Sequence, residues 1–154
     1  VVQAFENEDP DIIFVEGQSA VSHPAFMSSV GILKGSIPDG VILQHPPARE
    51  FRVDFPQMAM PTVESEIQMI ESISQSQVIA ITINHEDLTD EEVSEAIIEH
   101  EDRLLLPTTD VLKYGCGTLI QVLADRFPAL NEKIHQTNLD AIPIITMMSD
   151  EVIG

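Results

Sequence analysis

The feature that most constrains the fold is a series of short apolar runs without polar interruption, which alternate with stretches of helical pattern. Such runs are typical of strands that are buried on both faces of a parallel sheet. We expect strands at 12–15, 41–43, 78–83 and 104–106. We expect helices at 23–34, 62–74, 89–101 and 115–126. This order predicts an α/β fold, a three-layer and mostly parallel sheet with helices on both faces and right-handed crossovers.

Capping residues mark the starts of three of these helices. Ser22 precedes the first helix, Thr62 precedes the second, and Thr89 forms a capping box with Glu92 at the third. Two prolines interrupt residues 50–61, which we interpret as a loop, and residues 1–7 have the pattern of the end of a helix.

The helical and strand patterns fade after Pro128. We therefore predict a partial α/β domain over residues 1–127 and a C-terminal extension over residues 128–154. Residues 142–148 form either an additional strand or an ordered tail.

The composition excludes several classes of function. The 154 residues carry a formal net charge of -19, which repels nucleic acids and anionic membranes. A single cysteine excludes an internal disulfide, and no run approaches the ~20 apolar residues that a membrane helix needs. The first residues lack a secretory signal pattern, so we expect a cytoplasmic protein.

Polar residues follow the expected strands. The carboxyl ends of parallel strands lie at one edge of a sheet, where ligands of open α/β folds bind. Residues far apart in the sequence are therefore predicted to meet in one crevice. These residues are Glu16, Gly17, Gln18 and Ser19, then Gln44, His45 and Arg49, then Asn84 and His85, and finally Thr108, Thr109 and Asp110.

Several of these side chains have chemistry that fits such a crevice. His23 or His45 is the first choice for a general base, and Arg49 for a clamp on a carboxylate or phosphate. Glu16 stands where an acidic residue orients magnesium in P-loop proteins. A zinc site made of histidines and Glu16 is disfavoured, because no close-spaced ligand pair supports it. Alternatively, the histidines bond the backbone and Arg49 forms a surface ion pair.

Four segments carry a resemblance to a known family: VEGQSAVSHPAF, LKGSIPDGVILQHPPAR, VIAITINHEDLTDEE and LLLPTTDVLKYG. They resemble a family first described as a domain of unknown function, whose members join an N-terminal Rossmann-like domain to a C-terminal P-loop-type domain. Some members are D-glutamate N-acetyltransferases that use acetyl-CoA. The resemblance covers roughly residues 1–127. A weaker likeness connects the Glu16 and Asn84–Thr89 segments with dethiobiotin synthetases, which are P-loop ligases.

The sequence departs from that family in one respect, because it contains no G-x-x-x-x-G-K-[ST] phosphate loop. We expect the chain to be a fragment, a subunit that needs a partner carrying the other half, or a decayed copy. The expected partners are therefore a homo-oligomer or the missing N-terminal half. By itself it is not expected to bind a nucleotide or the CoA pyrophosphate tightly.

Three alternative functions follow, the first two implied by the resemblances and the third by the open edge of the sheet. As part of an N-acetyltransferase, Glu16 or His45 would act as base, Arg49 would hold the substrate carboxylate, and Asn84 would contact the cofactor. Gly17, Gln18, Ser19, His23 and Asp110 would complete the binding site. As part of a ligase that uses Mg-ATP, Glu16 would orient the metal. As a non-catalytic module, the chain would pair with another chain through its open sheet edge.

Overall fold

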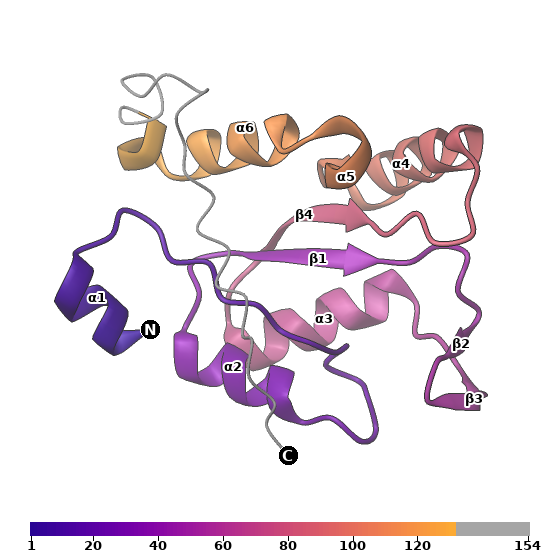
Figure 1. Ribbon diagram of the computed structural model, residues 1–154, viewed down its shortest axis with the longest axis horizontal. Helices are drawn as coiled ribbons and strands as arrows, with labels where there is room; N and C mark the ends of the chain where they lie inside the picture. The colour runs from indigo at the N-terminus through magenta and orange to yellow at the C-terminus, as the bar shows by residue number, and fades with distance from the viewer. Residues whose placement is uncertain (132–154) are drawn as a thin grey trace, which may run out of the picture. The chain divides into compact units, whose positions relative to one another are not determined.

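The computed structural model describes residues 1–131, which form an α/β structure around a three-stranded parallel sheet. The strands are β1 (Val41–His45), β4 (Val78–Ile83) and β5 (Thr108–Thr109), in the order β1-β4-β5. In Figure 1, helices α2 (Ser28–Ser36) and α3 (Val63–Ser74) lie on one side of the strands, and α4 (Asp90–Leu104) lies on the other. This arrangement confirms the predicted fold class.

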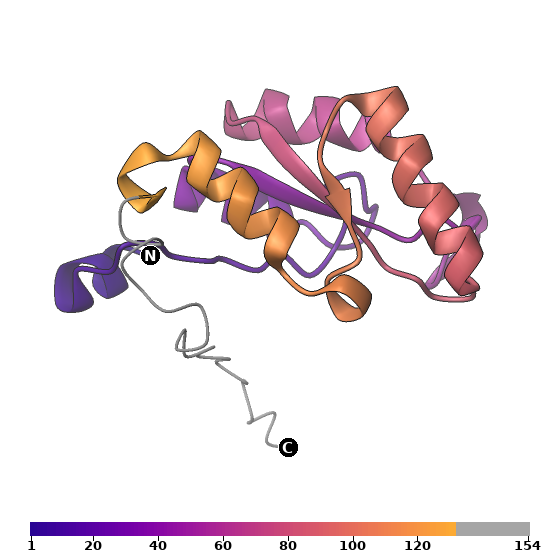
Figure 2. The same cartoon turned by 90° about the horizontal axis from the view of Figure 1, so that it is seen from above.

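Strand β4 is the centre of the core. All six of its residues are buried, as its uninterrupted apolar and β-branched sequence predicts. Ile81 and Ile83 pack with Val63 from α3 and Val93 from α4, so one cluster joins the sheet to both helices. Figure 2 shows these elements from the α4 side of the sheet.

The register of the strands determines which residues lie at the carboxyl edge. His45 pairs with Ile83, and Thr82 pairs with Thr109. The residues that follow these positions, Asn84 and Asp110, therefore leave the sheet at the same edge.

The predicted caps of α3 and α4 are confirmed. The Thr62 hydroxyl accepts a hydrogen bond from the Ser65 amide at 3.2 Å. Thr89 and Glu92 form the full capping box, in which the Glu92 carboxylate accepts the Thr89 amide at 2.8 Å. These bonds satisfy amides that have no partner inside the helix.

Two predicted strands are wrong. Residues 12–15 form no strand, and the Phe14 side chain is 71% exposed, because no neighbouring strand pairs with this run. Residues 104–106 are not a strand either, since α4 continues to Leu104 and Leu105 then adopts a left-handed conformation with φ 55°. The strand that completes the sheet is β5, after Pro107.

The segments around these elements also differ from the predictions. Helix α2 begins only at Ser28 and its N-cap, Met27, makes no side-chain cap, whereas the Ser22 hydroxyl bonds Arg52 instead. The predicted loop at 50–61 contains a short antiparallel hairpin, β2 (Phe51–Arg52) with β3 (Phe55–Ala59).

The remaining helices lie near the two ends of the described chain. The N-terminal helix was predicted and is present as α1 (Val2–Glu8). The predicted helix at 115–126 is α6 (Gly117–Arg126), and a short helix α5 (Val111–Tyr114) precedes it. Gly115, with φ 74°, separates the two in a conformation that favours glycine.

The chain forms two compact units, one over Val1–Val122 and one that begins at Leu123. The predicted boundary at 127/128 stays a prediction, and residues 142–148 lie outside the described range. Within residues 1–131, no helix is both long enough and apolar enough to cross a membrane.

Candidate active site

The carboxyl edge of the sheet is extended by a tight turn after β4. The Asn84 amide donates to the His45 carbonyl at 2.8 Å, which continues the strand ladder by one residue. The Asn84 side chain then accepts the Glu86 amide at 3.2 Å, and Asp87 adopts a left-handed φ of 59°. The turn thereby presents His85 and Glu86 at the edge where ligands of open α/β sheets bind.

His85 forms a hydrogen-bonded pair with Asp110. The His85 Nδ1 faces Asp110 Oδ2, while Oδ1 accepts the amides of Leu112 at 2.9 Å and Lys113 at 3.2 Å. Asp110 is thus the N-cap of α5, and its side chain is completely buried. The His85 side chain is 35% exposed. The carboxylate is therefore fixed inside the protein and holds a histidine that solvent can reach.

This pair has the chemistry of an oriented general base. A carboxylate that accepts the Nδ1 proton leaves the lone pair on Nε2 and stabilises the imidazolium that forms when Nε2 takes up a proton. Two amide donors to the other oxygen keep the carboxylate in place. His85 can therefore accept a proton from a substrate bound at the sheet edge.

The sequence placed His85 at a strand end and Asp110 among the binding residues, but it did not identify them as a pair. Their proximity depends on β5 lying next to β4, and the sequence pattern had put the fourth strand at 104–106. The usable signal was the position of each residue within two residues of the end of a β-branched or apolar segment.

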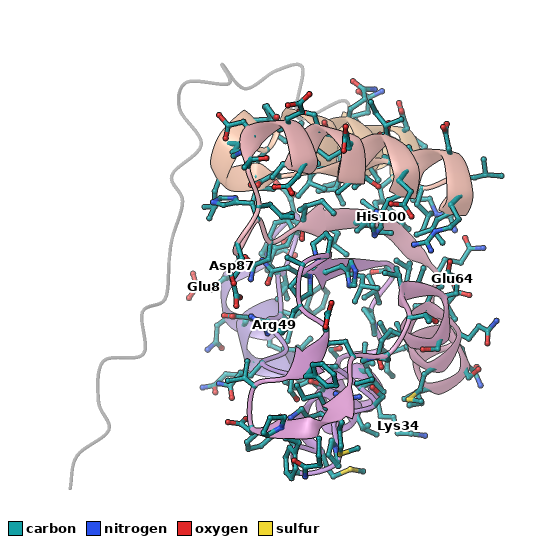
Figure 3. The ribbon with its side chains drawn as sticks, turned by 90° about the vertical axis from the view of Figure 1, so that its right-hand side faces the viewer. Glu8, Lys34, Arg49, Glu64, Asp87 and His100 are labelled. Atoms are coloured by element: carbon teal, nitrogen blue, oxygen red, sulfur yellow. The ribbon has the colours of Figure 1, made fainter. Side chains whose placement is uncertain are left out.

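His45, the predicted base, lies in a different group of side chains. Its ring is 5.3 Å from the ring of His100, a buried residue of α4. Burial is the main cause that lowers the pKa of His45 to about 4, and the neighbouring charges of His100 and Arg103 lower it further. Figure 3 looks at the strand ends and shows the His100 side chain between its own helix, α4, and the sheet. His45 is consequently a neutral, poorly basic imidazole.

Three predicted residues before α2 do not join the His85–Asp110 pair. Glu16, Gly17 and Gln18 are exposed, and within residues 1–131 no hydrogen bond or ion pair connects them with it. Ser19 contacts Ser29 at the start of α2, with 3.3 Å between their hydroxyl oxygens. Roles for these residues in binding substrate or magnesium stay predictions.

His23 is the other predicted base. Its Nδ1 accepts the Ala25 amide at 3.2 Å, and its ring lies 4.7 Å from Phe26 and 5.6 Å from Phe55. This is the alternative that the sequence left open for the histidines, a turn residue that bonds the backbone.

Arg49 lies at the carboxyl edge, where the sequence predicted it. Its guanidinium forms an ion pair with Glu86, the residue after His85. Its Nε is buried and has no hydrogen-bond partner in the part of the chain that the structure describes. Figure 3 shows Arg49 and Asp87 toward the same side of the strand ends.

The residues at this edge do not form a phosphate cradle or a metal centre. Residues 1–131 contain no group of three or more His, Cys, Asp or Glu side chains that is arranged to hold a metal ion. The glycine-rich loop that would surround a pyrophosphate is absent from the sequence. The ionisable groups that the structure shows at this edge are the His85–Asp110 pair and the Arg49–Glu86 ion pair.

Comparisons with known proteins give this geometry a context. Residues 1–120 match a family described as a domain of unknown function (DUF1611_C) P-loop domain. A protein from Tritonibacter scottomollicae named D-glutamate N-acetyltransferase is 27% identical over 125 residues, which cover 77% of this chain and 38% of that protein. A protein of the same name from a Pseudoalteromonas species is 27% identical over 112 residues, which cover 69% of this chain and 34% of that protein.

The fold also has a counterpart among solved structures. A crystal structure of a DUF1611 family protein from Anabaena variabilis ATCC 29413 is similar with a TM-score of 0.74 and 24% identity. The match covers 80% of this chain and 38% of that one. The family resemblance expected from the sequence is confirmed, and the chain spans little more than a third of the length of these relatives.

Proposed function

Since this chain belongs to the family of DUF1611 C-terminal P-loop domains, we propose that it is the C-terminal portion of an N-acetyltransferase. The enzyme would transfer the acetyl group of acetyl-CoA to the amine of an amino acid. The names of the two relatives suggest D-glutamate as the substrate.

The observation that carries the proposal is the His85–Asp110 pair at the sheet edge. An amino acid arrives with a protonated amine, which is not a nucleophile. His85 Nε2 takes the proton, and the freed nitrogen attacks the thioester carbonyl. The new C–N bond forms as the C–S bond breaks, the nitrogen gives up its second proton as it becomes an amide, and the departing CoA thiolate takes up that proton. Asp110 stabilises the positive charge on the imidazole.

Two further residues complete the proposed site. Arg49 holds a carboxylate of the substrate, because its planar guanidinium matches a carboxylate and its side chain is 29% exposed at the sheet edge. Asn84, whose backbone is fixed to β1, contacts the cofactor. His85 replaces His45 and Glu16 as base, since His45 has a pKa of about 4 and Glu16 is exposed and forms no hydrogen bond or ion pair with the His85–Asp110 pair within residues 1–131.

Binding of acetyl-CoA requires groups beyond these residues. The described chain offers no cradle for the pyrophosphate, so we infer that the remaining length of the full enzyme supplies it.

The test is an assay of the full-length enzyme that contains this chain. The protein is incubated with acetyl-CoA and D-glutamate, thiol release is followed optically, and N-acetylglutamate is identified by mass spectrometry. We expect one thiol per N-acetyl product. A parallel reaction contains Mg-ATP, an amine and a carboxylate donor. Release of ADP there, with no acetyl product in the first assay, would replace this proposal by the ligase alternative. No turnover in either would favour a non-catalytic module.

A further inference from the structure

We propose that His45 and His100 are positioning residues for the base His85. Their rings pack together and hold the turn at residues 84–87 against the end of β1 while the His45 ring is uncharged. When the His45 ring gains a proton, the turn leaves β1 and His85 loses its position. The inference rests on the proposed function for the role of His85, and it adds a regulation of the same site by pH.

The backbone of His45 is an attachment point of this turn. The Asn84 amide donates to the His45 carbonyl at 2.8 Å and so continues the ladder between β1 and β4. Inside the turn, the Asn84 side chain accepts the Glu86 amide at 3.2 Å, and the Leu88 amide donates to the His85 carbonyl at 3.1 Å. The turn is therefore closed by its own bonds, and the His45 carbonyl joins it to β1.

The side chain of the same residue packs against α4. The His45 ring lies 5.3 Å from the His100 ring, at an interplanar angle of 42°. His100 is 3% exposed, and its Nδ1 donates to the Ala96 carbonyl at 2.7 Å. The His100 ring therefore cannot turn away without breaking a buried hydrogen bond. A movement of His45 away from α4 changes both the ring contact and the position of the carbonyl that holds Asn84.

The surroundings of the His45 ring oppose a positive charge. Burial is the main cause that lowers its pKa to about 4, and the charges of His100 and Arg103 from α4 lower the pKa further. Glu64 from α3 raises the pKa, but this carboxylate is already paired with Arg103 at 3.3 Å. A protonated His45 is therefore more stable once its ring has left these neighbours, and the residue then takes its carbonyl with it.

The direction of the pH effect follows from the different proton affinities of the two forms. The ring has a pKa of about 4 in the closed form, and the ordinary value of 6.5 applies once solvent surrounds it. The open form therefore binds more protons, so the closed form is favoured above pH 6.5 and opening increases as the pH falls toward about 4. Between about pH 7.5 and about pH 5, the equilibrium constant for opening should rise about ten- to thirtyfold.

The experiment is hydrogen–deuterium exchange of the full-length enzyme without substrate, with the Asn84 amide resolved by fragmentation in the mass spectrometer. Rates are corrected for the intrinsic effect of pH on amide exchange. We expect the opening at Asn84 to rise about ten- to thirtyfold between about pH 7.5 and about pH 5. The Ile81 amide, which donates to the Pro107 carbonyl at 2.9 Å on the β5 side of β4, is the internal reference and should exchange more slowly.

Three variants separate the contributions. His45→Gln should remove most of the rise at Asn84, because glutamine gains no proton. His100→Ala removes the ring against which His45 packs, so it should increase the opening at Asn84 relative to Ile81 already at about pH 7.5. His23→Gln is the matched control with an unchanged rise, since the His23 ring contacts phenylalanine rings instead of the strand end.

The pH profile of kcat is the second readout. His45→Gln should keep a larger share of its neutral-pH rate at about pH 5 than the unaltered enzyme, because its turn stays closed. A rise at Asn84 that is as large in His45→Gln, equal exchange of Asn84 and Ile81, or identical pH profiles of kcat would overturn the inference. If the opening depends on His45 but no N-acetyl product forms, the proposed reaction fails while the attachment of the turn through His45 stands.

Discussion

At the scale of single residues, Asp110 connects the fold with the proposed chemistry. One oxygen caps α5 and the other orients His85, and the carboxylate is fully buried. A buried acceptor with three donors leaves those donors without partners when it is removed, which is strongly destabilising. The same side chain therefore affects stability and activity, and substitutions can separate the two effects.

We predict that Asp110→Ala lowers the free energy of unfolding by about 2–4 kcal/mol, because the helix cap and the bond to His85 are both lost. Asp110→Asn keeps an acceptor for the α5 amides and should cost clearly less. Denaturant unfolding measures both values. Asparagine should nevertheless reduce acetyl transfer strongly, since a neutral amide does not stabilise the imidazolium. Equal stability of the two variants would contradict the cap role.

His45 makes stability depend on pH. Its pKa of about 4 in the folded protein is below the ordinary value of 6.5, so the unfolded chain binds a proton that the folded chain resists. The contribution is complete above about pH 6.5 and is lost as the pH falls to about 4. We expect a loss of about 1–2 kcal/mol, because solvent screens the partly exposed ring. Urea unfolding at several pH values measures this dependence. The unfolding free energy of His45→Gln should change less between pH 6.5 and about pH 4 than that of the unaltered protein. An unchanged dependence on pH would refute the assignment.

At the scale of elements, helix caps allow a direct comparison between two sites. Thr89→Ala removes a two-way capping box from α4, and Thr62→Ala removes a one-way cap from α3. We expect losses of about 1 kcal/mol in unfolding free energy, with the larger loss at Thr89. Ser72→Ala, at an exposed position inside α3, is the control and should cost nothing, because alanine favours helix. A larger loss at Ser72 than at Thr89 would contradict this explanation.

The elements also show how far sequence reasoning reaches. β4 and α3 were predicted almost to the residue, and so was the start of α4, because uninterrupted β-branched runs and side-chain caps are local signals. The end of α4 lies three residues beyond the predicted one. The run at 12–15 has the same local signal but forms no strand, since pairing depends on a neighbour that local sequence does not reveal. The same distinction between local signals and strand pairing applies to the candidate site. The strand-end position of His85 could be predicted from local sequence, whereas its contact with Asp110 depends on the order of the strands in the sheet.

At the scale of the whole molecule, the net charge of -19 should make stability depend on salt. Mutual repulsion of the acidic side chains destabilises the compact state. Added salt shortens the Debye length and so weakens this repulsion. We predict that the thermal midpoint rises when sodium chloride increases from about 0.05 M to about 0.5 M. A midpoint that falls with salt would mean that ion pairs such as Arg103–Glu64 outweigh the repulsion.

The measurement that most directly tests the central claim is steady-state acetyl transfer by the full-length enzyme with His85→Gln, compared with His45→Gln and His23→Gln. Loss of a general base typically costs about a hundredfold or more in rate. We predict that only His85→Gln lowers kcat by this amount, with little change in KM, and that the other two variants stay within a few-fold of the unaltered enzyme. A nearly normal kcat for His85→Gln, or an equal loss for His45→Gln, would contradict the assignment of the His85–Asp110 pair as the base.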